Sequence, residues 1–112
     1  QYSKGGQGRK DIDKLLSGKL RVISTLDLHG YSQEEAQDVL NEFIDYVRLY
    51  GVCGEIIHGS GLGSRGFAPV LKHTVRRWLM QHPDVLAYTE PNGSNDGAVL
   101  ILLKRVWKEE SE

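Results

Sequence analysis

Two histidines, each followed by a glycine, are the residues of this chain best suited to chemistry. His29 lies in "LDLHG" at 26–30, two positions after Asp27, and His58 lies in "IIHGSG" at 56–61. If 26–30 belongs to a strand, its side chains alternate, so the leucines at 26 and 28 point to a core while Asp27 and His29 share the opposite face. A carboxylate beside an imidazole can orient it and tune it for proton transfer. The pattern therefore predicts a site for acid and base chemistry on the face away from the core.

Taken one at a time, these residues have plainer explanations. A lone His58 is more often a hydrogen-bonded structural residue than a ligand, and Asp27 alone is an ordinary exposed strand residue. Asp27 with two histidines could also recruit a metal ion, but the chain has neither an HExxH motif nor a set of cysteines for a preformed zinc site. His73 and His82 fall within and at the end of a predicted helix, so we interpret both as surface or capping residues.

The two histidines are expected to end neighbouring parallel strands. Residues 21–30 are rich in β-branched side chains and end on a glycine, which predicts a strand. Residues 31–51 carry apolar side chains at three- and four-residue steps, which predicts a helix; Ser32 and Glu35 fit a capping box and Gly51 a C-terminal cap. Residues 52–59 form the next strand, and a strand reached through a crossover helix is normally parallel to the first. Because ligands of open α/β sheets bind beyond the carboxyl ends of such strands, we expect one shared site.

The rest of the chain completes a two-layer fold. Glycines at 59, 61, 63 and 66 predict a strand-to-helix loop that is mobile without ligand and binds sulfate or phosphate through its backbone, although it lacks the lysine and hydroxyl residue of a P-loop. A second helix is predicted from Pro69 to His82, and strands at 85–90 and 98–107, the last apolar enough at 98–103 to be central. The predicted fold is an α/β (α+β) two-layer sandwich, βαβαββ, with two helices on one face of a four-stranded sheet and the other face partly open.

Composition bounds the class of protein. A chain of 112 residues with 39% hydrophobic and 26% charged residues favours one compact domain, which we expect to be a monomer. Cys53 is the only cysteine, which excludes a disulfide framework and favours a reducing compartment, so we expect a cytoplasmic location. We find no apolar run that could cross a bilayer and expect no membrane partner. The net charge of −1 argues against a uniformly basic nucleic-acid binder, yet residues 1–22 carry six basic and two acidic side chains. The chain starts at Gln1 rather than Met, so we interpret it as an excised or truncated domain.

Five ordered motifs give the chain a family resemblance. They are "LDLHG" at 26–30, "IIHGSG" at 56–61, "VLKHTVRRWL" at 70–79, "HPDVLAYTEP" at 82–91 and "DGAVLILLKR" at 96–105. Over residues 20–105 they resemble the small MutS-related (Smr) domain, and "DKLLSGKLR" resembles the stretch before this domain in stand-alone bacterial proteins. The resemblance implies a mixed four-stranded sheet with two helices, like the C-terminal domain of translation initiation factor three. It also implies nicking of DNA or cutting of RNA, including on stalled ribosomes.

The resemblance carries over to particular positions. Asp27, Leu28 and His29 occupy the family's Asp-Leu-His motif, and His58, Gly59 and Gly61 occupy its His-Gly-any-Gly motif. Ser60 stands where lysine is frequent, and Asp96-Gly97 replaces the usual glycine pair, so both departures weaken phosphate binding slightly without touching the acid and base. We divide the chain into a basic, partly flexible leader at 1–19, an Smr domain at 20–107 and a charged tail at 108–112.

These inferences predict an endonuclease that acts on phosphodiester bonds. His29 and His58 would be acid and base, with Asp27 orienting His29 and the amides of 59–61 stabilising the developing charge. Nucleic acid would be bound by Gly59, Ser60, Gly61, Arg65, Lys72, Arg76, Arg77, Lys19 and Arg21. RNA cleavage through the 2′-hydroxyl requires no cofactor, whereas DNA nicking would need a divalent metal, magnesium or manganese, at Asp27. The predicted partners are DNA or RNA, and the ribosome.

Two other functions stay open at the level of sequence. Near-neutral charge and the absence of lysine at position 60 leave room for a module that binds nucleic acid, the ribosome or a protein partner without cutting. The glycine-rich loop would also suit a small-molecule enzyme with a phosphorylated substrate, although no enclosed pocket is indicated. Turnover on labelled strands separates cutting from binding, and a salt series of RNA and DNA binding separates both from the small-molecule enzyme.

Overall fold

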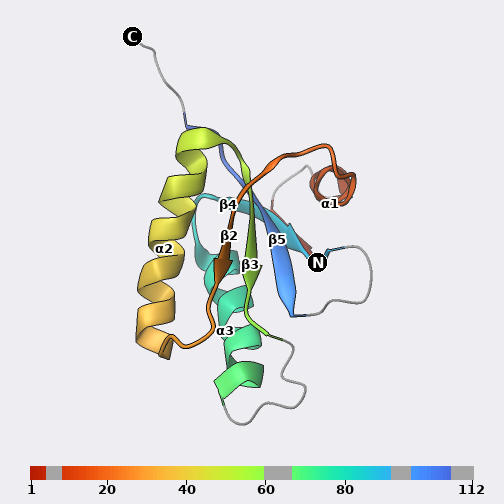
Figure 1. The fold of residues 1–112 in the computed structure, drawn as a ribbon. Helices are drawn as coiled ribbons and strands as arrows, with labels where there is room; N and C mark the ends of the chain where they lie inside the picture. The colour runs from red at the N-terminus through yellow and green to blue at the C-terminus, as the bar shows by residue number, and fades with distance from the viewer. Residues whose placement is uncertain (5–8, 60–66, 92–96, 107–112) are drawn as a thin grey trace.

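Five strands form one mixed sheet in the computed structural model, which describes residues 1–4, 9–59, 67–91 and 97–106 (Figure 1). The strands are β1 (Tyr2–Ser3), β2 (Val22–Asp27), β3 (Cys53–Ile57), β4 (Val85–Thr89) and β5 (Ala98–Leu103), in the spatial order β1-β4-β5-β3-β2. β2 and β3 are parallel, and the other neighbouring pairs are antiparallel. β2, β3 and β4 therefore run in the same direction. Their last residues meet at one edge of the sheet, which we call the carboxyl edge (residues 27–30, 57–59 and 89–91).

Helices lie on both faces of the sheet. α2 (Gln33–Tyr50) and α3 (Phe67–Gln81) cover one face, and α1 (Arg9–Leu16) packs on β4 and β5 from the other (Figure 1). The buried side chains between the sheet and the two longer helices include Leu40, Ile44, Ile56, Val75 and Ile101. Those on the α1 face are Ile12, Leu15, Cys53, Ala87 and Leu102. β5 has neighbours on both sides and contributes to both cores, which confirms the prediction that its apolar run is a central strand.

The crossover from β2 to β3 is confirmed in its local details. Ser32 Oγ accepts a hydrogen bond from the Glu35 amide at 3.1 Å, and the Glu35 carboxylate accepts one from the Ser32 amide at 2.9 Å, so the predicted capping box begins α2. At the other end the Gly51 amide donates to the Val47 carbonyl at 2.9 Å. The capping box is a local signal, so the sequence indicates where α2 begins after β2.

The predicted fold class is confirmed, but the predicted counts of four strands and two helices are too low. β1 adds a fifth strand by pairing with β4, and the Tyr2 ring stacks on Tyr88 with centroids 5.4 Å apart. α1 adds a third helix, whose Ile12 and Leu15 are buried. A two-residue strand shows no apolar period, and an eight-residue helix shows barely two turns of one, so neither gives a firm sequence signal. The described part of the leader therefore packs on the sheet.

The packing of α1 makes a testable contribution to stability. Leu15 is 4% exposed and lies in the α1 core, so Leu15→Ala should lower the free energy of unfolding by about 2 to 5 kcal/mol. Leu49, which is 62% exposed on α2, provides a matched control: Leu49→Ala should change that free energy by no more than about 0.5 kcal/mol. Urea unfolding of both variants measures the difference. Equal effects of the two substitutions would mean that α1 does not pack on the sheet in solution.

Candidate functional site

The two histidine motifs are neighbours at the carboxyl edge, as predicted. Asp27 pairs with Ile57 in the parallel ladder, and the Leu28 amide donates to the Ile57 carbonyl at 2.9 Å. Leu28 is fully buried, whereas Asp27 and His29 are exposed. The expected separation of the buried Leu28 from the exposed Asp27 and His29 is therefore confirmed.

A turn, rather than a strand, presents His29. β2 ends at Asp27, although the strand was predicted to continue to residue 30. The Asp27 Oδ1 accepts a hydrogen bond from the His29 amide at 2.9 Å, and Gly30 has φ +87°, a value that favours glycine. An aspartate that bonds the amide two residues later is a common way to begin a turn. Asp27 therefore contacts His29 through the backbone, and this bond fixes where the imidazole leaves the sheet.

His58 shares the edge with His29 but lies on the other face of the sheet from Asp27. Side chains alternate along β3, so His58 follows Ile56 toward α3, while Asp27 lies on the side of Ile57. His58 is only 4% exposed. The pairing of β2 with β3 confirms the predicted common edge. A substrate that reaches both Asp27 and His58 must therefore lie across the ends of β2 and β3.

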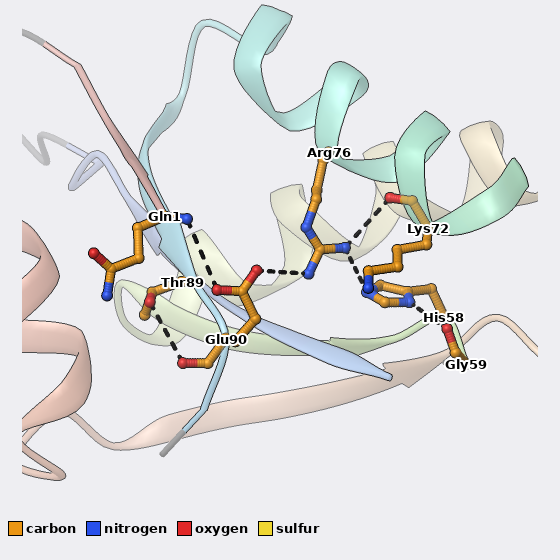
Figure 2. Close-up of polar contacts among 7 residues, drawn as sticks. All are labelled: Gln1, His58, Gly59, Lys72, Arg76, Thr89 and Glu90. Carbon is orange, nitrogen blue, oxygen red and sulfur yellow. Dashed lines mark hydrogen bonds and ion pairs between the residues drawn. The ribbon is translucent and has the colours of Figure 1, made fainter. Parts of the chain in front are cut away.

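The imidazole of His58 belongs to a hydrogen-bonded chain that the sequence did not indicate. Its Nδ1 lies 2.8 Å from the Gly59 carbonyl oxygen, and its Nε2 lies 2.8 Å from Nη1 of Arg76 on α3. Nη2 of the same arginine donates to Glu90 Oε2 at 2.9 Å, and Figure 2 shows Arg76 between the two partners. Glu90 directly follows β4, whose position next to β5 brings it to the carboxyl edge. Only the strand order could have identified it.

Glu90 carries a negative charge in this chain of contacts. Partial burial on its own raises the pKa of this carboxyl, but the hydrogen bond from Arg76, a backbone bond and nearby positive charges outweigh it, so the pKa of Glu90 lies below its ordinary value. The depressed pKa means that the contact stabilises the fold above the ordinary carboxyl pKa and is lost as the pH falls through the lower, folded-state value. At neutral pH the Arg76–Glu90 pair is therefore an ion pair.

Gly59, the first residue of the glycine-rich loop, makes a turn at the end of β3. Gly59 has φ +86°, which favours glycine at this turn, but its amide and that of His58 both donate to the Gly97 carbonyl at 2.9 Å. The Gly59 amide is therefore bonded within the protein, which counts against its predicted role as a phosphate donor. Ser60, Gly61 and Arg65, with the rest of the loop, lie outside the described residues.

The predicted phosphate-binding side chains are not all at the edge. Arg77 is exposed on α3, whereas Lys72 is half-buried and its carbonyl accepts from Arg76 at 3.3 Å. Arg76 itself bonds His58 and Glu90, so the structure does not present it as an open phosphate contact. Lys19 and Arg21 are exposed but precede β2, whose six residues separate them from the carboxyl edge by about 20 Å. Lys19 and Arg21 therefore lie at the opposite end of β2 from the histidines, and their role in binding nucleic acid stays a prediction.

The other titratable groups support the plainer interpretations made from the sequence. His73 is exposed on α3, and His82 follows that helix, where its Nδ1 accepts from the Asp84 amide at 3.0 Å. Burial lowers the pKa of His82, with nearby charges modifying the effect. Within the described ranges, no three His, Cys, Asp or Glu side chains gather as a metal site would require. In the same part of the chain, every helix is too short or too polar to span a bilayer.

Comparison with known proteins identifies the family. Residues 26–104 match the Smr domain, and this stretch begins at the "LDLHG" motif and continues through β5. The chain belongs to the Smr domain family. Among curated relatives, ribosome rescue factor SmrB of Vibrio cholerae is 34% identical over 106 residues, and that of Aliivibrio salmonicida is 32% identical. These alignments cover 92% of this chain but 54% and 56% of the relatives, so the chain spans little more than half of their length.

Solved structures share the Smr fold seen here. YdaL, a stand-alone small MutS-related protein from Escherichia coli, superposes with a TM-score of 0.77 at 30% identity, covering 93% of this chain and 82% of YdaL. The Smr domain of Thermus thermophilus MutS2 gives a TM-score of 0.60 at 21% identity, covering 73% of this chain and 99% of that domain. The second similarity concerns the fold alone. Together they show that the mixed sheet and its helices are the arrangement of an Smr domain.

Proposed function

We propose that this Smr domain cleaves phosphodiester bonds in RNA at the carboxyl edge, with His29 and His58 as the proton-transfer groups and Asp27 positioning His29. The observation that supports this most directly is the pairing of β2 with β3, since it puts both histidine segments at one edge while His29 remains exposed. Strand ends of this kind are where α/β sheets bind ligands. The family membership supports nucleic acid as the ligand.

RNA is the substrate that these groups suit best. Its 2′-hydroxyl can attack the neighbouring phosphorus, so that the 2′-O–P bond forms and the P–O5′ bond breaks; one imidazole takes the hydroxyl proton and the other gives a proton to the leaving oxygen. Nicking of DNA would instead need an activated water, with a divalent metal held at Asp27. Arg77 and Lys72 on α3 would contact the phosphates, and Ser60, Gly61 and Arg65 would complete this surface. Lys19 and Arg21 would contact only a strand that continues along β2.

The ribosome is the proposed setting of this reaction. Relatives that share 30% or more of the sequence carry the name ribosome rescue factor, which supports RNA on ribosomes as the substrate and a cytoplasmic location. Binding without cleavage is the second candidate, and one observation favours it: His58 is buried and both of its ring nitrogens are already hydrogen-bonded. A group in that state must exchange a partner before it can move a proton.

A cleavage assay decides between these functions. The chain is incubated with end-labelled single-stranded RNA and with supercoiled DNA, each in magnesium and in chelator. We expect RNA fragments that end in a 2′,3′-cyclic phosphate in both conditions, because the nucleophile belongs to the substrate. RNA that is bound but not cut would favour the binding module, and DNA nicking that chelator abolishes would favour metal-activated water.

A further inference from the structure

Arg76 of α3 connects the ends of β3 and β4 at the carboxyl edge. From α3 its guanidinium contacts His58 at the end of β3 and Glu90 just after β4 (Figure 2). Its side chain is only 13% exposed, and the charged group lies over the Tyr88 ring, 5.9 Å from the centroid. A guanidinium that is bonded along both of its edges and stacked on a ring has a fixed orientation. Because its partners are protein groups, Arg76 can act on the other residues of the site.

The directions of these hydrogen bonds determine where the proton of His58 lies. An arginine side chain only donates, so Nε2 of His58, which lies 2.8 Å from Arg76 Nη1, must accept. A backbone carbonyl only accepts, so Nδ1, which lies 2.8 Å from the Gly59 oxygen, must carry the hydrogen. The two contacts therefore define a neutral imidazole with its hydrogen on Nδ1. Free imidazole side chains favour the other tautomer, with the hydrogen on Nε2, so the surroundings of His58 have selected the less usual form.

Glu90 keeps the Arg76 guanidinium in the orientation in which Nη1 faces His58. Its Oε2 accepts from Nη2 at 2.9 Å, on the opposite side of the guanidinium from the nitrogen that faces His58. Because the guanidinium is a rigid plane, a bond that fixes one nitrogen also fixes the direction of the other. The carboxylate also neutralises the arginine charge beside a buried imidazole.

We infer that Arg76, anchored by Glu90, is a positioning residue for His58: it holds the imidazole neutral, with the hydrogen on Nδ1 bonded to the Gly59 carbonyl. The consequence for catalysis rests on the proposed function. A neutral imidazole suits the base that accepts the proton of the 2′-hydroxyl, which leaves His29 as the acid. In the reaction the hydroxyl takes the place of Arg76 Nη1 at Nε2.

The tautomer of His58 can be measured without any cleavage assay. In ¹⁵N NMR spectra at about pH 8.5, where histidines are neutral, the His58 signals are those that disappear in His58→Asn. We expect the pattern of a protonated Nδ1 in the wild type and a shift toward protonated Nε2 in Arg76→Gln. Arg77→Gln removes the same charge from the next, exposed residue of α3 and is the matched control, which should leave the tautomer unchanged. A wild type with the hydrogen on Nε2, or a folded Arg76→Gln variant with an unchanged tautomer, would overturn the inference.

Two further variants keep the test decisive if Arg76→Gln does not fold. Arg76→Lys retains a donor for Nε2 and should keep the hydrogen on Nδ1, whereas Glu90→Gln removes the charge that anchors Arg76 and should populate both tautomers. If the tautomer of His58 were unchanged in Glu90→Gln, Glu90 would not be needed to orient Arg76.

The effect on cleavage separates this inference from the proposed function. Arg76→Gln should lower kcat for RNA by about 10- to 100-fold with little change in KM, as expected for a displaced catalytic group, and Arg76→Lys should restore part of the rate. Arg77→Gln should act mainly on KM. If the tautomer depends on Arg76 but the wild type does not cleave RNA, the positioning role holds and the proposed function fails. If RNA is cleaved and the tautomer shifts without a loss of kcat, Arg76 does not position His58 for the reaction.

Discussion

Replacing His29 by alanine should lower kcat for RNA cleavage by about 100- to 10,000-fold, the range for loss of a general acid or base, while RNA affinity stays close to that of the wild type. His29 is exposed at the end of β2 and its amide is held by Asp27, so its imidazole can reach a substrate without rearrangement of the core. Affinity should change little because phosphate contacts come from basic residues and backbone groups. Single-turnover cleavage of labelled RNA measures the rate, and filter binding at fixed salt measures the affinity.

A second histidine supplies the control for this experiment. His73 is also exposed, but it lies on α3 and does not belong to the carboxyl edge, so His73→Ala should leave both rate and affinity unchanged. If His29→Ala cleaved RNA at the wild-type rate, the carboxyl edge would not be the catalytic site. If affinity fell while kcat stayed at the wild-type value, His29 would contribute to binding alone, and the two-histidine reaction would lose its acid.

The difference in burial between His29 and His58 also bears on how the rate of RNA cleavage depends on pH. His29 is exposed, whereas His58 is buried and bonded to Arg76. A reaction that needs one neutral and one protonated imidazole has a bell-shaped dependence of rate on pH. The residual cleavage rate of His29→Ala should lose one side of this bell-shaped pH profile. A rate that only rises with pH, and that chelator abolishes, would favour metal-activated water over the two-histidine reaction.

Sequence patterns predicted the parts of the site that depend on local signals. The apolar period of α2 and the capping pair Ser32 and Glu35 are properties of neighbouring residues, and they determine how β2 connects to β3. A crossover between parallel strands then brings His29 and His58 to one edge without any further information. The turn at Asp27 could also have been predicted from the sequence, because aspartate commonly bonds the amide two residues later.

The surroundings of His58 could not be predicted in this way. Arg76 is 18 residues and Glu90 is 32 residues from His58 in the sequence. They form one chain of contacts with it because β4 and β5 are neighbours in the sheet and α3 packs on β4. Strand order depends on which long-range pairings bury the most apolar surface, and the local pattern does not contain that choice. The sequence therefore predicted Arg76 only as a phosphate contact. In the structure its side chain is 13% exposed and is bonded to His58 and Glu90.

A pair of substitutions at Asp27 should reveal what its carboxylate does. Asp27→Ala removes the acceptor that holds the His29 amide, so the turn loosens and kcat for RNA should fall by about 100-fold. Asp27→Asn keeps an oxygen acceptor of nearly the same shape and removes only the charge. If Asp27 acts by positioning His29, the asparagine variant should therefore keep most of the activity. Measuring kcat for both variants, in magnesium and in chelator, separates orientation from charge.

The opposite result has an equally definite meaning. If both variants lost activity to the same large extent, and chelator reduced the wild type to the level of Asp27→Asn, the carboxylate would be binding a metal ion, because an amide oxygen is a far weaker ligand for magnesium or manganese. Asp27 would then activate water, and DNA would become as suitable a substrate as RNA. Activity that persists in Asp27→Ala would show that His29 is positioned by the fold of the edge itself, through the buried Leu28 and its bond to the Ile57 carbonyl.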